Sequence, residues 1–177
     1  MNDSSHIQEW RQTIASVREK DGDRAFLNWS GFDEFRDLDT AHLRGAWDFS
    51  CQVLSPLAPF LTVPEDRDIL EIGYGGGRLL GAAARHFRTA IGLDVHPCGA
   101  VVKRHLAERG ARNLLLLQGD GSSIPLRDAT MDCAYSFIVL QHLAHLSLLT
   151  AYFRETFRVL RPGGVALLYF GRYSWHW

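Results

Sequence analysis

A negatively charged residue and several glycines stand together where a hydrophobic segment ends. The segment ILEIGYGGG places Glu71 two positions before Gly73, and Gly75, Gly76 and Gly77 follow. Glycine adopts positive φ angles and carries no side chain, so it lets a ligand lie directly against the backbone. A helix that begins after such a loop also presents unpaired backbone N–H groups. These residues predict a ligand site at the end of a strand.

The spacing of the glycines argues against a dinucleotide site. The dinucleotide fingerprint GxGxxG needs a third glycine, and the frame that starts at Gly73 has Arg78 at that position. A carboxylate at Glu71 would repel a pyrophosphate, whereas it suits a positively charged ligand. A nicotinamide-dependent oxidoreductase is therefore disfavoured. A structural alternative stays open, in which Glu71 only accepts N–H bonds within the loop.

The pattern Glu71-x-Gly73-x-Gly75-x-Gly77 resembles the first motif of the class I S-adenosylmethionine-dependent methyltransferases. Three later stretches resemble the same family in the same order: AIGLDVHP, LLLLQGDGSSIPLRDATMDCAYSFIVLQHL and FRETFRVLRPGGVALLYF. The likeness extends over roughly residues 66–170 and is to small-molecule methyltransferases of the ubiquinone and menaquinone biosynthesis type. Four ordered motifs are more specific than a single glycine loop.

The resemblance implies that the cofactor is S-adenosylmethionine. Its methionine part would lie on the glycine backbone, with Glu71 facing the cationic sulfonium and ammonium groups. Asp94, at the end of AIGLD, would accept hydrogen bonds from the ribose hydroxyls. The alternative for Asp94 is a helix cap, because Pro97 suits a first helical turn.

The third stretch would hold the adenine. Asp120 would accept a hydrogen bond from the adenine amino group, and the backbone of Gly121 would line the same pocket. Asp120 has an alternative as an Asx-turn with Gly121 and Ser122. Ser136, at the end of the fourth strand, would bring its backbone or hydroxyl group to the cofactor.

His142 is the candidate for acting on the methyl acceptor. It matches a histidine that this family has at the mouth of the substrate cleft, and it would act as a general base where the acceptor must lose a proton. A packed or solvated histidine is the alternative. His145 would lie three residues further along the same helix, but without a third ligand nearby we expect no metal site. Arg44 is a candidate partner for the carboxylate of the cofactor, with a surface arginine as the alternative.

Short hydrophobic runs alternate with helical stretches from residue 67 onward. The expected strands are ILEIG, AIGLD, NLLLLQ, MDCAYSFIV and GGVALLYF, and the expected helices are GRLLGAAARHF, CGAVVKRHLAERG and LSLLTAYFRETFRVL. Strands that are hydrophobic throughout are buried on both faces. The sequence therefore predicts an α/β fold over residues 67–177, a Rossmann-like doubly wound parallel sheet with helices on both faces.

Residues 1–66 are expected to form a helical cap. Hydrophobic residues recur every three or four positions from Ile7 to Val17, which indicates an amphipathic helix, and KDGDR breaks the pattern. We expect a second helix, capped by Asp39 and Thr40, that ends near Pro56. Its hydrophobic residues would be Leu43, Trp47 and Leu54. Aromatic candidates for the substrate pocket are Trp10, Trp29, Trp47 and the tail YSWHW.

The sheet of the resembled family ends in an antiparallel pair of strands, and this sequence stops shortly after its expected fifth strand. We therefore expect that strand pair to be missing and the fifth strand to be an edge that a partner chain or a further C-terminal segment covers. This expectation keeps a second interpretation open, a cofactor-binding or degenerate methyltransferase module of a larger protein.

The composition is that of a soluble globular protein. The 177 residues are 46% hydrophobic and carry a net charge of −1, so nucleic acid is not an expected partner. The three cysteines lack CxxC spacing, which disfavours zinc and disulfides and suggests buried thiols. The sequence has no membrane-spanning run and no signal peptide, so we expect a cytoplasmic protein without a membrane partner.

Overall fold

The computed structural model describes residues 3–29, 37–143 and 145–171. Its centre is a parallel sheet in the order β3-β2-β1-β4-β5. The strands are β1 (Asp68–Ile72), β2 (Thr89–Asp94), β3 (Leu114–Gln118), β4 (Met131–Ser136) and β5 (Leu160–Leu168). The direction of strand order reverses between β1 and β4, which opens a crevice at their carboxyl ends. The prediction of a doubly wound parallel sheet is confirmed.

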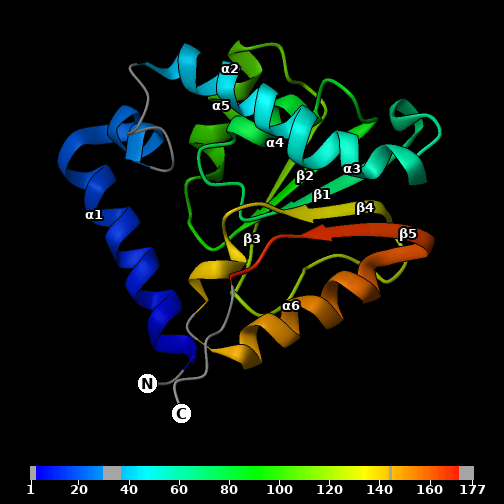
Figure 1. Ribbon diagram of the computed structural model, residues 1–177. Helices are drawn as coiled ribbons and strands as arrows, with labels where there is room; N and C mark the ends of the chain where they lie inside the picture. The colour runs from blue at the N-terminus through cyan, green and yellow to red at the C-terminus, as the bar shows by residue number, and fades with distance from the viewer. Residues whose placement is uncertain (1–2, 30–36, 144, 172–177) are drawn as a thin grey trace.

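Helices cover both faces of this sheet (Figure 1). On one face lie α2 (Leu38–Asp48), α4 (Arg78–Ala83) and α5 (Gly99–Glu108), and on the other lies α6 (Leu146–Val159). The buried residues of α6 recur at helical spacing and include Leu149, Tyr152 and Val159. Burial on both faces explains why the strands are hydrophobic throughout.

Two N-terminal helices precede the sheet, and the second begins earlier than predicted. The first, α1 (Asp3–Trp29), is kinked at Gly22, in the segment where a break was expected. The N-cap of α2 is Asp37, whose side chain accepts a hydrogen bond from the backbone N–H of Thr40 at 2.7 Å. The prediction of Asp39 and Thr40 as caps is therefore wrong, because both residues already lie in the first turn.

Small residues form the buried face of α2. Leu43 is 74% exposed and Trp47 is 67% exposed, whereas Ala41 and Gly45 are buried. A Cβ atom on Gly45 would lie 2.6 Å from the backbone oxygen of Arg78. Close packing of α2 on α4 thus requires small residues, and this requirement outweighs the burial of large hydrophobic side chains.

The α-helical part of this segment ends at Leu57, one residue after Pro56. A π-helical stretch (Phe49–Leu54) continues α2, and α3 (Ser55–Leu57) and a 3-10 turn (Ala58–Phe60) follow. Pro56 lies in the first turn of α3, where a helix tolerates the missing N–H group. Further 3-10 turns are Pro64–Asp66 and Leu140–His142.

Of the three cysteines, Cys98 and Cys133 are buried, but Cys51 is exposed, which contradicts the prediction of burial for that residue. None of the helices in the described parts of the chain combines the length and hydrophobicity needed to cross a membrane.

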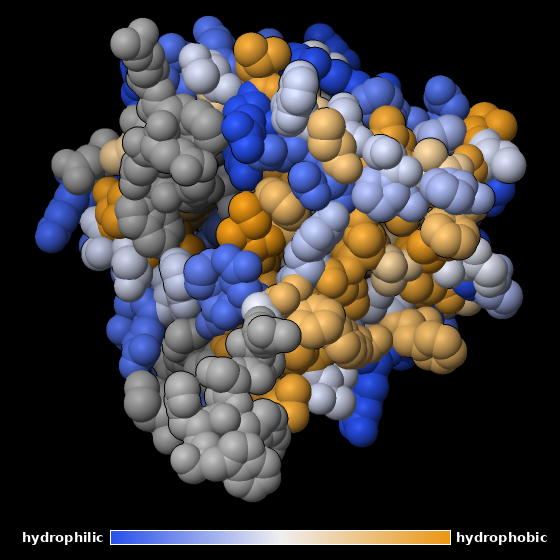
Figure 2. All heavy atoms as spheres, in the orientation of Figure 1, coloured by the Kyte–Doolittle hydropathy of each residue, from blue (hydrophilic) through white to orange (hydrophobic). Residues whose placement is uncertain are grey.

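Within the described residues, β5 pairs only with β4 and so forms one edge of the sheet. Phe157 of α6 is 83% exposed, and Phe170 after β5 is also exposed. Figure 2 shows hydrophobic residues gathered on the side of the molecule where β5 and α6 lie in Figure 1. What covers this edge stays a prediction.

Candidate functional site

A cavity of about 550 Å³ opens at the carboxyl ends of β1, β2 and β4. Its walls come from the glycine loop after β1, the end of β2, the segment after β4 and α1. The predicted site residues that line it are Glu71, Gly73, Gly75, Asp94, Gly121 and His142. Gly77, Asp120 and Ser136 are not among its lining residues.

The glycine loop has the backbone conformation that the glycine pattern indicates. Gly73, Gly75 and Gly77 all have positive φ angles, of 82°, 50° and 84°. A Cβ atom on Gly73 would lie only 2.3 Å from a methyl group of Val139. The loop therefore requires glycine at Gly73 for both conformation and space.

Gly77 and Ser136 face the interior of the protein. A Cβ atom on Gly77 would lie 2.8 Å from side-chain atoms of Val102 and Leu106, so this glycine allows α5 to pack against the loop. The Ser136 hydroxyl donates to the backbone carbonyl of Ile72 at 2.9 Å and joins β4 to β1.

Glu71 is buried in the cavity wall. Tyr135 lies opposite it in the β1–β4 register and donates its hydroxyl to Glu71 Oε2 at 2.8 Å. Burial raises the pKa of Glu71 to about 8, although the Tyr135 hydrogen bond and the positive charge of Arg78 act in the opposite direction. Tyr135 could not be identified from the sequence, because its place beside Glu71 depends on a pairing between strands that are distant along the chain.

Asp94 ties the end of β2 to the glycine loop. Its carboxylate accepts hydrogen bonds from the backbone N–H groups of Gly75 at 2.8 Å and Val95 at 2.7 Å. It does not cap α5, which begins at Gly99 with Cys98 at the N-cap. A carboxylate has about four acceptor positions, so Asp94 can also accept hydrogen bonds from ribose hydroxyls.

His96 is a second residue of this wall that the sequence did not indicate. Its ring is buried, its Nδ1 accepts from the backbone N–H of Cys98 at 3.1 Å, and its Nε2 lies 3.1 Å from the carbonyl oxygen of Gly75. These contacts fit a neutral imidazole that donates from Nε2. Together with Asp94 it holds both the N–H and the C=O group of Gly75.

Asp120 forms the Asx-turn that was the alternative for it. Its side chain accepts from the backbone N–H groups and hydroxyls of Ser122 and Ser123. Although burial alone would raise it, these hydrogen bonds lower the pKa of Asp120 to about 2. Gly121, in contrast, lines the cavity with a φ of 95° and packs against Ile7. Adenine recognition by Asp120 stays a prediction.

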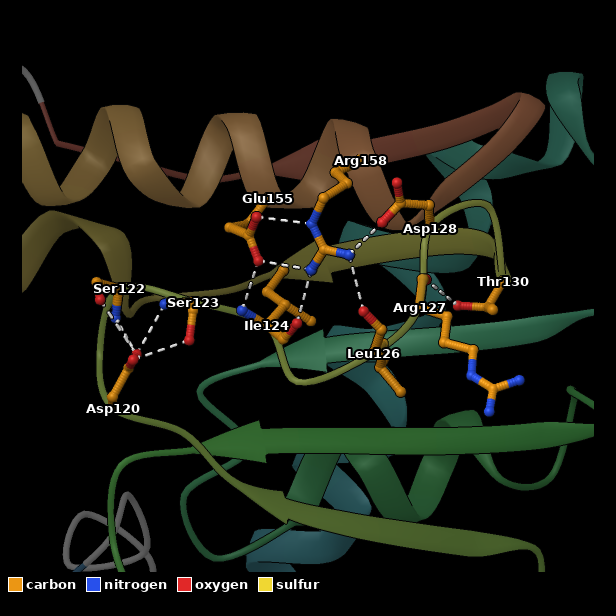
Figure 3. Close-up of polar contacts among 10 residues, drawn as sticks. All are labelled: Asp120, Ser122, Ser123, Ile124, Leu126, Arg127, Asp128, Thr130, Glu155 and Arg158. Atoms are coloured by element: carbon orange, nitrogen blue, oxygen red, sulfur yellow. Dashed lines mark hydrogen bonds and ion pairs between the residues drawn. The ribbon is translucent and has the colours of Figure 1, made fainter.

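Arg158 of α6 holds the loop that carries Asp120 and Gly121 (Figure 3). Its guanidinium donates to the backbone oxygens of Ile124 and Leu126, each at 2.8 Å. It also pairs with Asp128 and with Glu155, and Glu155 in turn accepts from the backbone N–H of Ile124. This network explains how α6, on the far face of the sheet, positions the loop beside the cavity.

We expect the substitution Arg158→Met to lower the free energy of unfolding by about 2 kcal/mol, because it removes charge-assisted hydrogen bonds to two backbone carbonyls while keeping the hydrophobic stem. Urea unfolding measures the change. Arg154→Met, at an exposed arginine of the same helix, is the control and should change the free energy by less than about 0.5 kcal/mol. Equal urea midpoints for the two variants would show that the loop carrying Asp120 and Gly121 keeps its conformation without the hydrogen bonds from Arg158.

Helix α1 covers the cavity on its open side. Ile7, Trp10 and Ile14 line it from one face of the helix. Arg11 donates from Nε to the carbonyl of Val95 at 3.0 Å and from Nη2 to the carbonyl of Gly119 at 2.6 Å. Because these carbonyls follow β2 and β3, Arg11 fastens α1 across the ends of both strands.

His142 lies at the cavity beside α1. Its ring centre is 6.3 Å from that of Trp10, in a tilted arrangement. His145 does not share a helix with it, because the turn ends at His142 and α6 begins at Leu146. Trp47 is exposed and away from the cavity. The side chain of Trp29 and the tail YSWHW lie outside the described residues.

Arg44, the predicted partner of a cofactor carboxylate, does not line the cavity. It pairs with Asp48, and so does Arg78, which does line it. The signal for Arg78 was present in the sequence, since it directly follows the last glycine of the loop, but it served only to exclude a dinucleotide.

Comparisons with known proteins agree with this geometry. The methyltransferase domain family matches residues 70–168. A probable S-adenosylmethionine-dependent methyltransferase of Mycolicibacterium smegmatis is 36% identical over 102 residues, which are 58% of this chain and 37% of that protein. An uncharacterized methyltransferase of Mycobacterium sp. strain JLS is 30% identical over 76% of this chain and 52% of that protein.

A solved structure of similar fold is the Haemonchus contortus phosphoethanolamine N-methyltransferase 1 in complex with phosphoethanolamine and S-adenosylhomocysteine. It aligns with a TM-score of 0.66 and 17% identity over 94% of this chain and 33% of that chain. This chain spans about a third to a half of the length of these relatives. The chain belongs to the methyltransferase domain family, of the class I S-adenosylmethionine-dependent kind.

Proposed function

We propose that the chain binds S-adenosylmethionine in this cavity and transfers its methyl group to a small-molecule acceptor. The observation that carries the proposal is a buried acid, Glu71, in the same wall as a bare glycine backbone. The cavity volume of about 550 Å³ lies within the range of small-molecule sites. The finer assignment to the ubiquinone and menaquinone biosynthesis type stays a prediction.

The acidic and hydrophobic residues that line the cavity fit this cofactor. Glu71 and Asp94 are the acidic groups of the wall, and a sulfonium with an adjacent ammonium is a cationic ligand. Hydrophobic residues make up much of the remaining wall, as a nucleoside base requires. They include Ile72, Leu93, Val139, Leu143 and Tyr152.

The cofactor supplies a methyl group that is already activated by the sulfonium, so the protein mainly positions the acceptor. Alignment of two reactants can provide several kcal/mol, of the order of 7 to 11 in well-oriented systems. Trp10 and Ile14 of α1 line the side of the cavity that faces this helix. For an acceptor hydroxyl, His142, which lines the cavity, would receive the proton.

The small-molecule character of the acceptor is supported by the position of α1. Arg11 fastens α1 over the cavity, and the side chains of Ile7 and Trp10 narrow the space beside it. An acceptor that enters such a covered site is compact. Turnover with a panel of small acceptors would test this part of the proposal and would separate an enzyme from a module without independent catalysis.

Calorimetry tests the cofactor assignment. We expect saturable binding of S-adenosylmethionine and S-adenosylhomocysteine and no binding of NAD. Binding of NAD alone would overturn the proposal in favour of an oxidoreductase. The absence of binding of all three ligands would overturn any cofactor role for the cavity.

Replacing Asp94 by alanine is expected to weaken S-adenosylhomocysteine binding by at least about 1 kcal/mol, since a charge-assisted hydrogen bond contributes about 1.5 to 3 kcal/mol. The substitution also removes the acceptor of the Gly75 N–H group, so its thermal stability is measured in parallel. Asp94→Asn keeps one acceptor oxygen and should lose less affinity. Unchanged affinity of the alanine variant would remove Asp94 from the ligand site.

A further inference from the structure

A second, smaller cavity lies between the start of α5 and β3. Its volume is about 240 Å³, just below the roughly 300 to 1,000 Å³ of sites for drug-sized ligands. Its walls are the first turns of α5, the strand β3, the segment that joins β2 to α5, and Tyr74 of the glycine loop. None of the described residues that line it is acidic. The cavity therefore suits a small ligand with a negative charge.

The hydroxyl of Tyr74 forms no hydrogen bond with any residue that the structure describes. Only 4% of the surface of Tyr74 is exposed, and its ring packs edge-on against that of His96. A Cβ atom on Gly99 would lie 3.3 Å from the Tyr74 hydroxyl oxygen, so the hydroxyl points to the start of α5. A buried donor without an acceptor costs free energy, and a ligand that accepts from it would remove this cost.

The phenol of Tyr74 stays protonated and is therefore a hydrogen-bond donor. Burial raises its pKa, and the negative charges of Asp94 and Glu71 add to the effect. These two carboxylates line the larger cavity but not the smaller one. The acidic groups near Tyr74 thus belong to the glycine-loop side, whereas its hydroxyl end meets α5.

Helix α5 presents further donors to the same space. It has 10 residues, and its N-cap residue Cys98 makes no side-chain hydrogen bond. The first N–H groups of a helix lack intrahelical partners and carry a partial positive charge. Gly99 and Ala100, the first two residues of α5, line the cavity. Lys103, one turn further along, lines it as well and forms no ion pair with a described acidic residue.

We propose that this smaller cavity binds a phosphate group, held by the first N–H groups of α5, the Lys103 ammonium and the Tyr74 hydroxyl. Helix N-termini bind phosphate through free N–H groups and the helix dipole, and a tetrahedral anion accepts hydrogen bonds from several directions. The proposal goes beyond the proposed function, because the site is a separate one. The two cavities share only Tyr74 and His96 among their described lining residues.

Calorimetric titration with inorganic phosphate at constant ionic strength tests the proposal. We expect saturable binding of one phosphate per chain. Lys103→Gln and Tyr74→Phe should each weaken it by about tenfold, as the loss of one charge-assisted hydrogen bond predicts. Lys20→Gln is the matched control, since Lys20 is exposed on α1 and lines neither cavity. It makes the same change in net charge and should leave the phosphate affinity within about twofold.

Urea unfolding separates a loss of the site from a loss of the fold. Tyr74→Phe should leave the urea midpoint unchanged or raise it, because its hydroxyl bonds to none of the described residues. Phosphate uptake that does not saturate would overturn the proposal. An equal loss in Lys103→Gln and Lys20→Gln, or an unchanged phosphate affinity of Tyr74→Phe, would also overturn it.

Two further titrations identify the source of the phosphate and its place. Glycerol 3-phosphate, a phosphate monoester, should bind more tightly than inorganic phosphate if the natural ligand is an organic phosphate, and more weakly if it is the free ion. Inorganic phosphate should still bind in the presence of saturating S-adenosylhomocysteine, and complete displacement would place it in the larger cavity and overturn the proposal. If the chain binds phosphate but not S-adenosylhomocysteine, only the proposed function fails; in the reverse case only this inference fails.

Discussion

The substitution Gly73→Ala is expected to lower the free energy of unfolding by about 2 to 5 kcal/mol and to abolish measurable cofactor binding. Two physical effects add up. A non-glycine residue in the left-handed region costs about 1 to 2 kcal/mol, and Gly73 has a φ of 82°. The new Cβ would lie 2.3 Å from a methyl group of Val139, and overpacking of this kind costs about 1 to 3 kcal/mol.

Gly110→Ala is the matched control for Gly73→Ala. Gly110 has a φ of 91°, but a Cβ atom there would meet nothing within 4 Å. It should therefore lose only the conformational part, about 1 to 2 kcal/mol in urea unfolding. The difference between the two variants measures the contact with Val139.

A double-mutant cycle separates this contact from other effects. In a Val139→Ala background, the cost of Gly73→Ala should fall part of the way toward the cost of Gly110→Ala, because the two nearest atoms, both methyl carbons of Val139, are removed, whereas the Val139 Cβ at 2.8 Å stays. If Gly73→Ala and Gly110→Ala lower the free energy of unfolding by the same amount in the wild-type background, the Val139 side chain moves away without cost. The steric contribution predicted for Gly73→Ala would then be wrong.

The second large effect concerns the charge of Glu71. We expect S-adenosylmethionine binding near pH 7 to release up to one proton, because burial raises the pKa of Glu71 to about 8 in the protein without ligand and a cation in the cavity favours the ionised form. The affinity should accordingly rise with pH by as much as about tenfold per unit below pH 8. The charged groups that act on Glu71 are those of Arg78 and Asp94, together with the hydrogen bond from Tyr135.

Calorimetry in two buffers of different ionisation enthalpy measures the proton release. Glu71→Gln is the control, since it keeps the size and a hydrogen-bond acceptor for Tyr135 but cannot titrate. The ionisations of the ligand itself are the same for both proteins, so the difference between them isolates Glu71. Identical proton release by wild-type protein and Glu71→Gln would show that Glu71 does not respond to the ligand.

The same group makes stability depend on pH in a defined direction. An unfolded glutamate ionises near 4.5, so between about pH 4.5 and 8 the folded protein without ligand holds one more proton than the unfolded chain. The free energy of unfolding from this group therefore falls as the pH rises through that window and is constant above it. Urea unfolding of Glu71→Gln should lack this component.

Local sequence patterns were sufficient for the elements that carry the site. The five hydrophobic runs became the five strands, and the glycine loop after β1 has the positive φ angles that its composition indicates. The α2 helix shows the limit of such patterns. Leu43 and Trp47 have the right spacing for a buried face, but the helix turns its small residues toward α4 instead.

The carboxylates also show which features local sequence patterns predict and which they do not. Glu71 was expected beside the ligand from the glycine motif and Asp94 from its position at the end of a strand, and both line the cavity. Asp120 has an equally suggestive position, yet its side chain turns to Ser122 and Ser123, because a short carboxylate in a tight turn finds its nearest donors in the turn itself.

The sequence by itself determined that this protein has a parallel α/β sheet with a glycine loop and acidic groups at the carboxyl ends of its strands. Those features depend on residues that are close together along the chain. Only the tertiary structure decided that Tyr135 pairs with Glu71, that Asp48 holds Arg78, and that α1 covers the cavity through Arg11. Each of these contacts joins residues far apart in sequence, so it depends on strand register and helix packing, which no local pattern encodes.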